Sequence, residues 1–137
     1  MRYESTQVVA RLGAVFGAFV IFAGCATREA REPRKGELLV SWMPPTTNSD
    51  GSPLTDLASY RIYFNTDKKV PPCPGGLSVK VDAKAVGRTP DGRVSVILSN
   101  FVVGQTYHVA LTAINSRGVA SPCSDTASAP AHLPDKK

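Results

Sequence analysis

Apolar and polar residues alternate most regularly in the last third of the chain. Every second residue from Tyr107 to Ala113 is apolar and is separated from the next by His108, Ala110 or Thr112. A period of two is typical of a strand with one buried and one exposed face. We therefore expect a central strand here.

Similar but shorter patterns occur elsewhere in the chain. Leu38, Val40 and Trp42 fall on one face of the run over 37–43, which stops at Pro44 because proline cannot donate a hydrogen bond to a sheet. Gly and Pro contribute 11 residues each and separate these short runs, which indicates an all-β protein. The predicted strands besides the central one are 37–43, 59–65, 77–82, 93–98 and 119–127, the last interrupted by Pro122.

Length and composition allow one ordinary domain. The chain has 137 residues, of which 42% are apolar, enough for a single hydrophobic core. We expect the residues that define this core to be Trp42, Tyr60, Leu98 and Tyr107.

Three segments together resemble a known family. Leu98, Phe101, Gly104 and Tyr107 follow the spacing L-x-x-F-x-x-G-x-x-Y, the tyrosine-corner pattern of β-sandwiches. Two further runs show the same resemblance: V-x-W-x-P-P at 40–45 and PPTTNSDGSPLTDLASYRIYF at 44–64. They resemble bacterial extracellular fibronectin type III domains, although Val-Gly-Gln replaces the usual Pro-Gly-Thr before the corner. The resemblance implies an immunoglobulin-like, two-sheet β-sandwich over 37–128, followed by a disordered tail over 129–137.

The N-terminus has the features of a bacterial export signal. Two arginines precede an apolar run over 12–23, shorter than the roughly 18 residues that a membrane-spanning segment needs. The run ends in FAGC at 22–25, which resembles the lipobox of bacterial lipoproteins, with Phe in place of the usual Leu. This resemblance implies a signal peptide over 1–24 and lipid attached to the Cys25 thiol, because only a thiolate is nucleophilic enough to accept it.

Two alternatives to lipidation stay open at this stage: secretion after cleavage near Ala26, and an uncleaved anchor. Ala26, which follows Cys25 in place of an Asp, resembles the residue at this position in lipoproteins that are sorted to the outer membrane. Residues 25–36, the lipidated Cys and the polar stretch after it, should form a flexible tether. Its last residues could instead add a short first strand to the sandwich.

The other two cysteines are predicted to form a disulfide. Whichever way export removes or modifies Cys25, Cys73 and Cys123 remain in an oxidising compartment. Two buried unpaired thiols, or a metal site with two Cys ligands, are the competing interpretations.

No catalytic, cofactor or metal site is predicted. His108 lies on the exposed face of the central strand and His132 in the expected tail, far from any nucleophile in sequence. Asn48, Asp50 and Asp56 lack the alternating ligand spacing of a calcium loop, so Asp50-Gly51 is better explained as a tight turn. The net charge of +5 is scattered along the chain and does not indicate nucleic-acid binding.

The expected function follows from these features. We expect a non-catalytic protein of the cell envelope, exported and anchored through Cys25 to lipid of the cell membrane or outer membrane. Its fibronectin type III domain would serve as a binding or structural module for an unidentified envelope protein or polysaccharide. The alternative is a secreted accessory module that binds carbohydrate or peptide, for which Tyr63 is the only exposed aromatic candidate.

Overall fold

The computed structural model describes residues 5–12, 18–25 and 31–136 and divides the chain into two units, Met1–Glu32 and Pro33–Lys137. The first unit contains an antiparallel hairpin of β1 (Ser5–Leu12) and β2 (Ala18–Cys25). This hairpin lies within the predicted signal peptide, whose cleavage stays a prediction. Residues 26–30 of the predicted tether lie outside the described residues.

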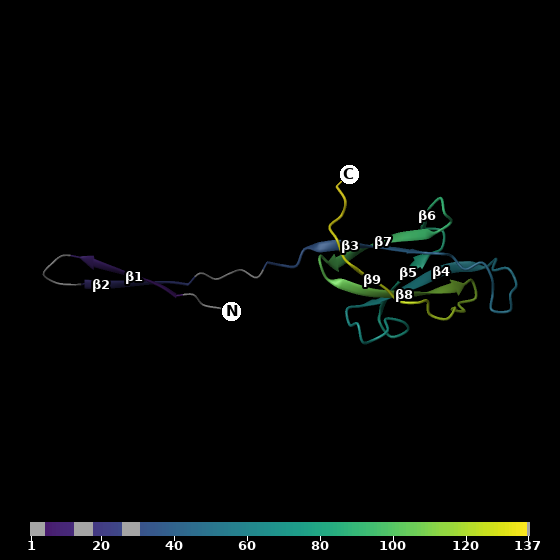
Figure 1. The fold of residues 1–137 in the computed structure, drawn as a ribbon, viewed down its shortest axis with the longest axis horizontal. Helices are drawn as coiled ribbons and strands as arrows, with labels where there is room; N and C mark the ends of the chain where they lie inside the picture. The colour runs from purple at the N-terminus through teal and green to yellow at the C-terminus, as the bar shows by residue number, and fades with distance from the viewer. Residues whose placement is uncertain (1–4, 13–17, 26–30, 137) are drawn as a thin grey trace. The chain divides into compact units, whose positions relative to one another are not determined.

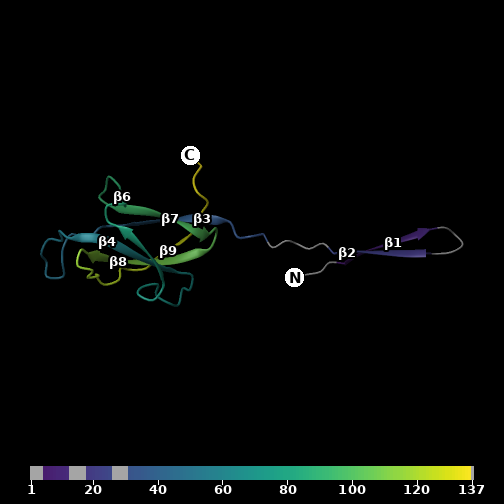
Figure 2. The same cartoon turned by 180° about the vertical axis from the view of Figure 1, so that it is seen from behind.

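The second unit is a β-sandwich of two antiparallel sheets, and the described residues include no helix that could span a membrane. One sheet has the order β3-β7-β6 and the other the order β5-β4-β8-β9. Figure 1 shows the two layers, and Figure 2 shows them from behind. The strands are β3 (Lys35–Trp42), β4 (Leu57–Asn65), β5 (Leu77–Asp82), β6 (Gly87–Arg88), β7 (Val94–Val102), β8 (Thr106–Asn115) and β9 (Ala127–Pro130).

Both sheets contribute apolar side chains to one core. Trp42 from β3 and Tyr60 from β4 pack edge to face across the two sheets, with ring centroids 4.8 Å apart. Phe101 and Tyr107 make a second edge-to-face pair at 4.6 Å. Such pairs add about 0.5–1.5 kcal/mol to the stabilisation that burial provides. Leu98 is also buried in this core.

A tight corner connects β7 to β8. The backbone N–H of Val102 donates to the Tyr107 hydroxyl oxygen at 3.1 Å, which supplies the backbone partner that a corner tyrosine needs. Gly104 in the corner has a φ of 83°, a left-handed conformation that favours glycine. The bond and the glycine together fix the change of direction between the two sheets.

A β-bulge at Asn100 explains why Leu98 and Phe101 are both buried although they are three residues apart. Gly36 pairs with Phe101 and Glu37 pairs with Ser99, so Asn100 is the extra residue of β7. Its φ of 71° is left-handed, a conformation that Asn tolerates better than most residues. The bulge turns Phe101 to the core side of the sheet.

The predicted tether ends earlier than expected. β3 begins at Lys35, so Lys35 and Gly36 belong to the sandwich and not to the tether. Gly36 is buried, and a Cβ atom there would come within 2.5 Å of the carbonyl oxygen of His132. Glycine is therefore required where the C-terminal segment passes over the start of β3.

The predicted disordered tail over 129–137 is wrong for its first residues. Ala129 and Pro130 lie in β9, and Ala131 is only 3% exposed. His132 then pairs with Glu37 of the other sheet, so the segment crosses from one layer to the other (Figure 1). Sequence pattern could not show this, because the partners are almost a hundred residues away.

The predicted last strand over 119–127 is also wrong. The regular ladder to β8 covers Ala127–Pro130 only, and the residues before it make irregular contacts with β8. Pro122 has no N–H to donate, which interrupts regular pairing at that point.

Candidate functional site

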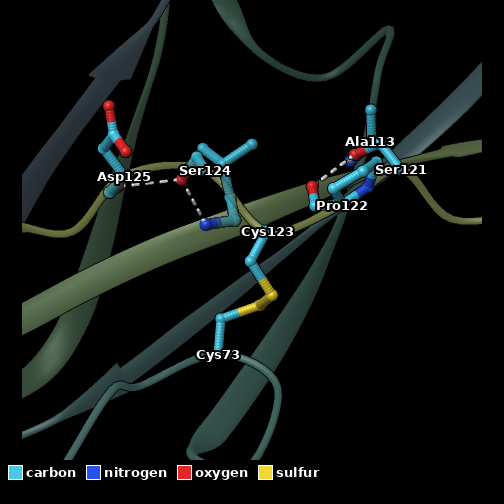
Figure 3. The surroundings of a disulfide bond; sticks show 8 residues. Cys73, Ala113, Ser121, Pro122, Cys123, Ser124 and Asp125 are labelled. Atoms are coloured by element: carbon cyan, nitrogen blue, oxygen red, sulfur yellow. Dashed lines mark hydrogen bonds between the residues drawn. A yellow bond between two sulfur atoms is a disulfide. The ribbon is translucent and has the colours of Figure 1, made fainter. Parts of the chain in front are cut away.

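A disulfide joins Cys73 and Cys123, with Cα atoms 6.1 Å apart and a sequence separation of 50 residues (Figure 3). Cys73 lies in the connection between β4 and β5 and is buried together with Pro72. Cys123 lies in the exposed connection between β8 and β9. The bond therefore fastens two connections that would otherwise have few apolar contacts.

Two serines beside Cys123 replace regular strand pairing. Ser121 donates its N–H to the carbonyl of Ala113 at 2.8 Å, and its hydroxyl accepts the N–H of Ala113 at 3.0 Å. Ser124 makes the same two bonds with Leu111, both at 2.9 Å (Figure 3). A serine hydroxyl thus takes the place of the backbone carbonyl on either side of Cys123. Serines flanking a Pro-Cys pair were the only signal for this arrangement in the sequence.

The connection over 66–76 lies beside the outer side of β8. Val70 and Pro72 line a small cavity of about 190 Å³ together with His108. Ala110 and Thr112, which also point outward from β8, are buried. The central strand is therefore covered on both faces, and the predicted exposed face is wrong for these two residues.

The larger cavity of the sandwich is a groove of about 630 Å³ between β3 and β9. Each of these strands forms an edge of its own sheet, so the groove opens where the two layers are not closed by a further strand. Most of its lining is apolar, with Arg93 and Asp125 as the charged exceptions. The lining side chains that belong to the core cluster or pack against it are Leu38, Val40, Trp42, Val109 and Leu111.

The edge of β3 beside the groove has unpaired backbone groups. Glu37 directs both its N–H and its carbonyl away from β7, because they bond to His132 at 2.7 and 3.0 Å. Alternate residues of an antiparallel strand point the same way, so Leu39 and Ser41 also face outward. Within 31–136, only Arg93 bonds to these groups, donating to the Ser41 carbonyl at 3.2 Å.

The two histidines lie in separate places, and neither forms an ion pair with a carboxylate in the part of the chain that the structure describes. His108 bonds to the hydroxyl of Ser128 at 2.6 Å, and His132 bonds to the backbone of Leu133. No group of three or more His, Cys, Asp or Glu side chains suitable for a metal ion is present among the described residues.

Asp50 occupies a tight turn, as predicted, and does not belong to a ligand cluster. Gly51 has a φ of 84° and donates its N–H to the carbonyl of Asn48 at 3.0 Å. The hydroxyl and then the N–H of Ser52 donate to the Asp50 carboxylate and lower its pKa below the ordinary value.

The predicted site residues lie in separate places. Trp42 is the one that lines the groove, whereas Tyr60, Leu98 and Tyr107 lie in the core away from its lining. Cys25 ends β2 in the other unit. Sequence reasoning missed the groove, because it depends on which strands end up at the sheet edges.

No known protein family matches the chain, and no curated protein is similar to it in sequence.

Proposed function

We propose that the chain is a non-catalytic, lipid-anchored protein of the cell envelope whose fibronectin type III domain acts as a binding or structural module. The anchor would be Cys25, at the end of an FAGC lipobox. The anchor would place the sandwich outside the cytoplasm, at the cell membrane or outer membrane.

The Cys73–Cys123 disulfide is the observation that carries this proposal. Disulfides persist in oxidising compartments and are rare in the cytosol. A disulfide in a chain whose apolar run over 12–23 leads into an FAGC lipobox supports export followed by anchoring. The diacylglycerol on a lipidated cysteine carries two acyl chains. Two chains are enough to hold a small domain at a membrane without a spanning helix.

The three-plus-four strand arrangement and the tyrosine corner support the fibronectin type III assignment. The module would bind through its surface, since fold alone does not define a ligand. A secreted carbohydrate-binding module is less well supported, because Tyr63 is half-buried and cannot form an aromatic platform by itself.

Cell fractionation of a bacterium that expresses the chain tests the anchor. Wild-type protein should sediment with membranes in a mature form, and Cys25→Ser should accumulate as a larger precursor. Cys73→Ser is the matched control, because it replaces a cysteine and breaks the disulfide without touching the lipobox, and it should leave membrane anchoring intact. Soluble wild-type protein of mature size would overturn the proposal.

A further inference from the structure

We infer that the open edge of β3 and the adjacent groove bind an extended segment of another polypeptide, which adds a strand to the three-stranded sheet. The segment would carry apolar side chains at alternate positions. This inference deepens the proposed function, because it rests on the sandwich being a binding module and names the class of partner.

Most of the edge of β3 lacks the features that protect an exposed strand, and Arg93, which donates to the Ser41 carbonyl, is the exception. Proteins usually block sheet edges with charged residues, prolines, bulges or very short strands. β6 has two residues, β9 has four and ends in Pro130, and β5 carries Lys80. Residues 38–42 of β3 and the following Met43 carry no charge, and Leu39 and Met43 are more than half exposed.

The C-terminal segment shows that this edge accepts a strand. His132 already pairs with Glu37 through two backbone hydrogen bonds. A bound segment would continue this pairing along β3 toward Pro44, with Leu39 and the N–H of Ser41 as its backbone partners, because the Ser41 carbonyl already accepts from Arg93. At about 3.3 Å per residue, the remaining edge accommodates a segment of about five residues.

The groove suits the side chains of such a segment. Successive side chains of a strand point to opposite faces, so every second one would enter the groove and contact Val40, Trp42 and Leu111. The others would lie on the outer face beside Leu39 and its cross-strand neighbour Ile97, which are both exposed. In addition, the buried indole N–H of Trp42 has no acceptor among the described residues. This unpaired donor belongs to a side chain that lines the groove.

A second copy of the chain does not satisfy these features equally well. If two β3 edges paired, the inward side chains of each strand would remain in their own core and leave both grooves unfilled. Residues 31–34, which precede β3, do not pair with the edge either, because Arg34 is held by Val103, whose N–H donates to the Arg34 carbonyl at 3.0 Å. His132 also occupies the position that they would have to pass.

Peptide binding to the purified full chain tests the inference. The probes are blocked nine-residue peptides with Val, Ile, Leu or Phe at alternate positions and Thr between them. We expect at least one to slow hydrogen exchange at the Leu39 and Ser41 amides by about tenfold or more at saturation. The same peptide should change the fluorescence of Trp42, the only tryptophan of the chain.

Two controls separate backbone pairing from simple apolar adsorption. The same peptide with N-methylated Thr residues should lose binding, since it cannot donate to β3. Leu39→Pro removes an N–H that does not bond to β7 and should weaken binding by about tenfold, whereas Leu39→Thr keeps that N–H and should bind more tightly than Leu39→Pro.

Several results would overturn the inference. The first two are that the N-methylated peptide binds as tightly as the unmodified one, or that no probe protects the Leu39 and Ser41 amides from exchange. The other two are that both amides already exchange slowly in the unliganded monomer, or that their protection arises from dimerisation alone. The peptide assay uses purified protein and does not depend on where the cell places it. Its failure is thus distinguishable from failure of the anchor in the fractionation experiment.

Discussion

Glu37 and His132 exchange two backbone hydrogen bonds, with N···O distances of 2.7 and 3.0 Å, and thereby connect the C-terminal segment to the first strand of the sandwich. The preceding residue, Ala131, is buried against the core, and Gly36 allows the close approach. The C-terminal segment therefore closes one end of the sandwich as an integral part of the fold.

This closure predicts that Ala131→Asp destabilises the domain by about 3 kcal/mol, because it places an unpaired carboxylate in the core. Leu133→Asp is the matched control and should change the free energy of unfolding by less than about 0.5 kcal/mol, since Leu133 is about half exposed. Urea denaturation measures both. Equal effects of the two substitutions would mean that the segment is not docked.

The core residue Trp42 and the corner residue Tyr107 should contribute different amounts to the free energy of unfolding. Trp42→Ala should cost about 3–5 kcal/mol, because it leaves a large cavity next to Tyr60. Tyr107→Phe should cost about 1–2 kcal/mol by leaving the N–H of Val102 without its hydroxyl acceptor. Denaturant melts test both values. A silent Tyr107→Phe variant would contradict the role given to the corner hydrogen bond.

The bulge makes a prediction about backbone conformation. Asn100→Val should cost about 1–2 kcal/mol, because a β-branched residue is strained at a φ of 71°. Asn100→Gly adopts this conformation without strain and should remain within about 1 kcal/mol of wild type. Thermal unfolding of the two variants decides the point, and an equally large loss with Gly would indicate that the Asn side chain matters more than its backbone.

The turn around Asp91 predicts a dependence on pH. The hydroxyl of Thr89 and then the N–H of Arg93 donate to the Asp91 carboxylate and lower its pKa below the ordinary value. A group whose pKa is lower in the folded state binds fewer protons there, so its stabilisation is present at neutral pH. It is lost as the pH falls below about 4 and through the folded pKa.

NMR titration of the Asp91 carboxyl carbon measures this effect. Its midpoint should lie below that of an unstructured Asp and should rise toward the ordinary value in Thr89→Val, which lacks the donor. A wild-type midpoint at or above the ordinary value would contradict the hydrogen-bonded turn.

Local patterns in the sequence predicted most strands and the core side of each. The alternation around Trp42 and Tyr107 depends only on near neighbours, so it is visible without the structure. The disulfide followed from the count of cysteines and the expected compartment. Its Cα separation of 6.1 Å is within the range that a disulfide spans.

Features that depend on distant partners were not predictable. The bulge at Asn100 is visible only from its pairing with β3, and Ala131 looked like part of a tail because it is buried among core residues that are distant in sequence. The irregular pairing at Ser121 and Ser124 has the same explanation, since hydroxyl acceptors leave no periodic pattern. The groove is the clearest case, because it exists only where two sheet edges meet.

The most direct test of the anchored-module account is the mass of the mature N-terminal peptide from membrane-extracted protein. We predict that the chain begins at Cys25 and that this residue carries a thioether-linked diacylglycerol and an acylated amino group, while Cys73 and Cys123 resist alkylation until they are reduced. A mature chain that begins at another residue, or an unmodified Cys25, would contradict the account.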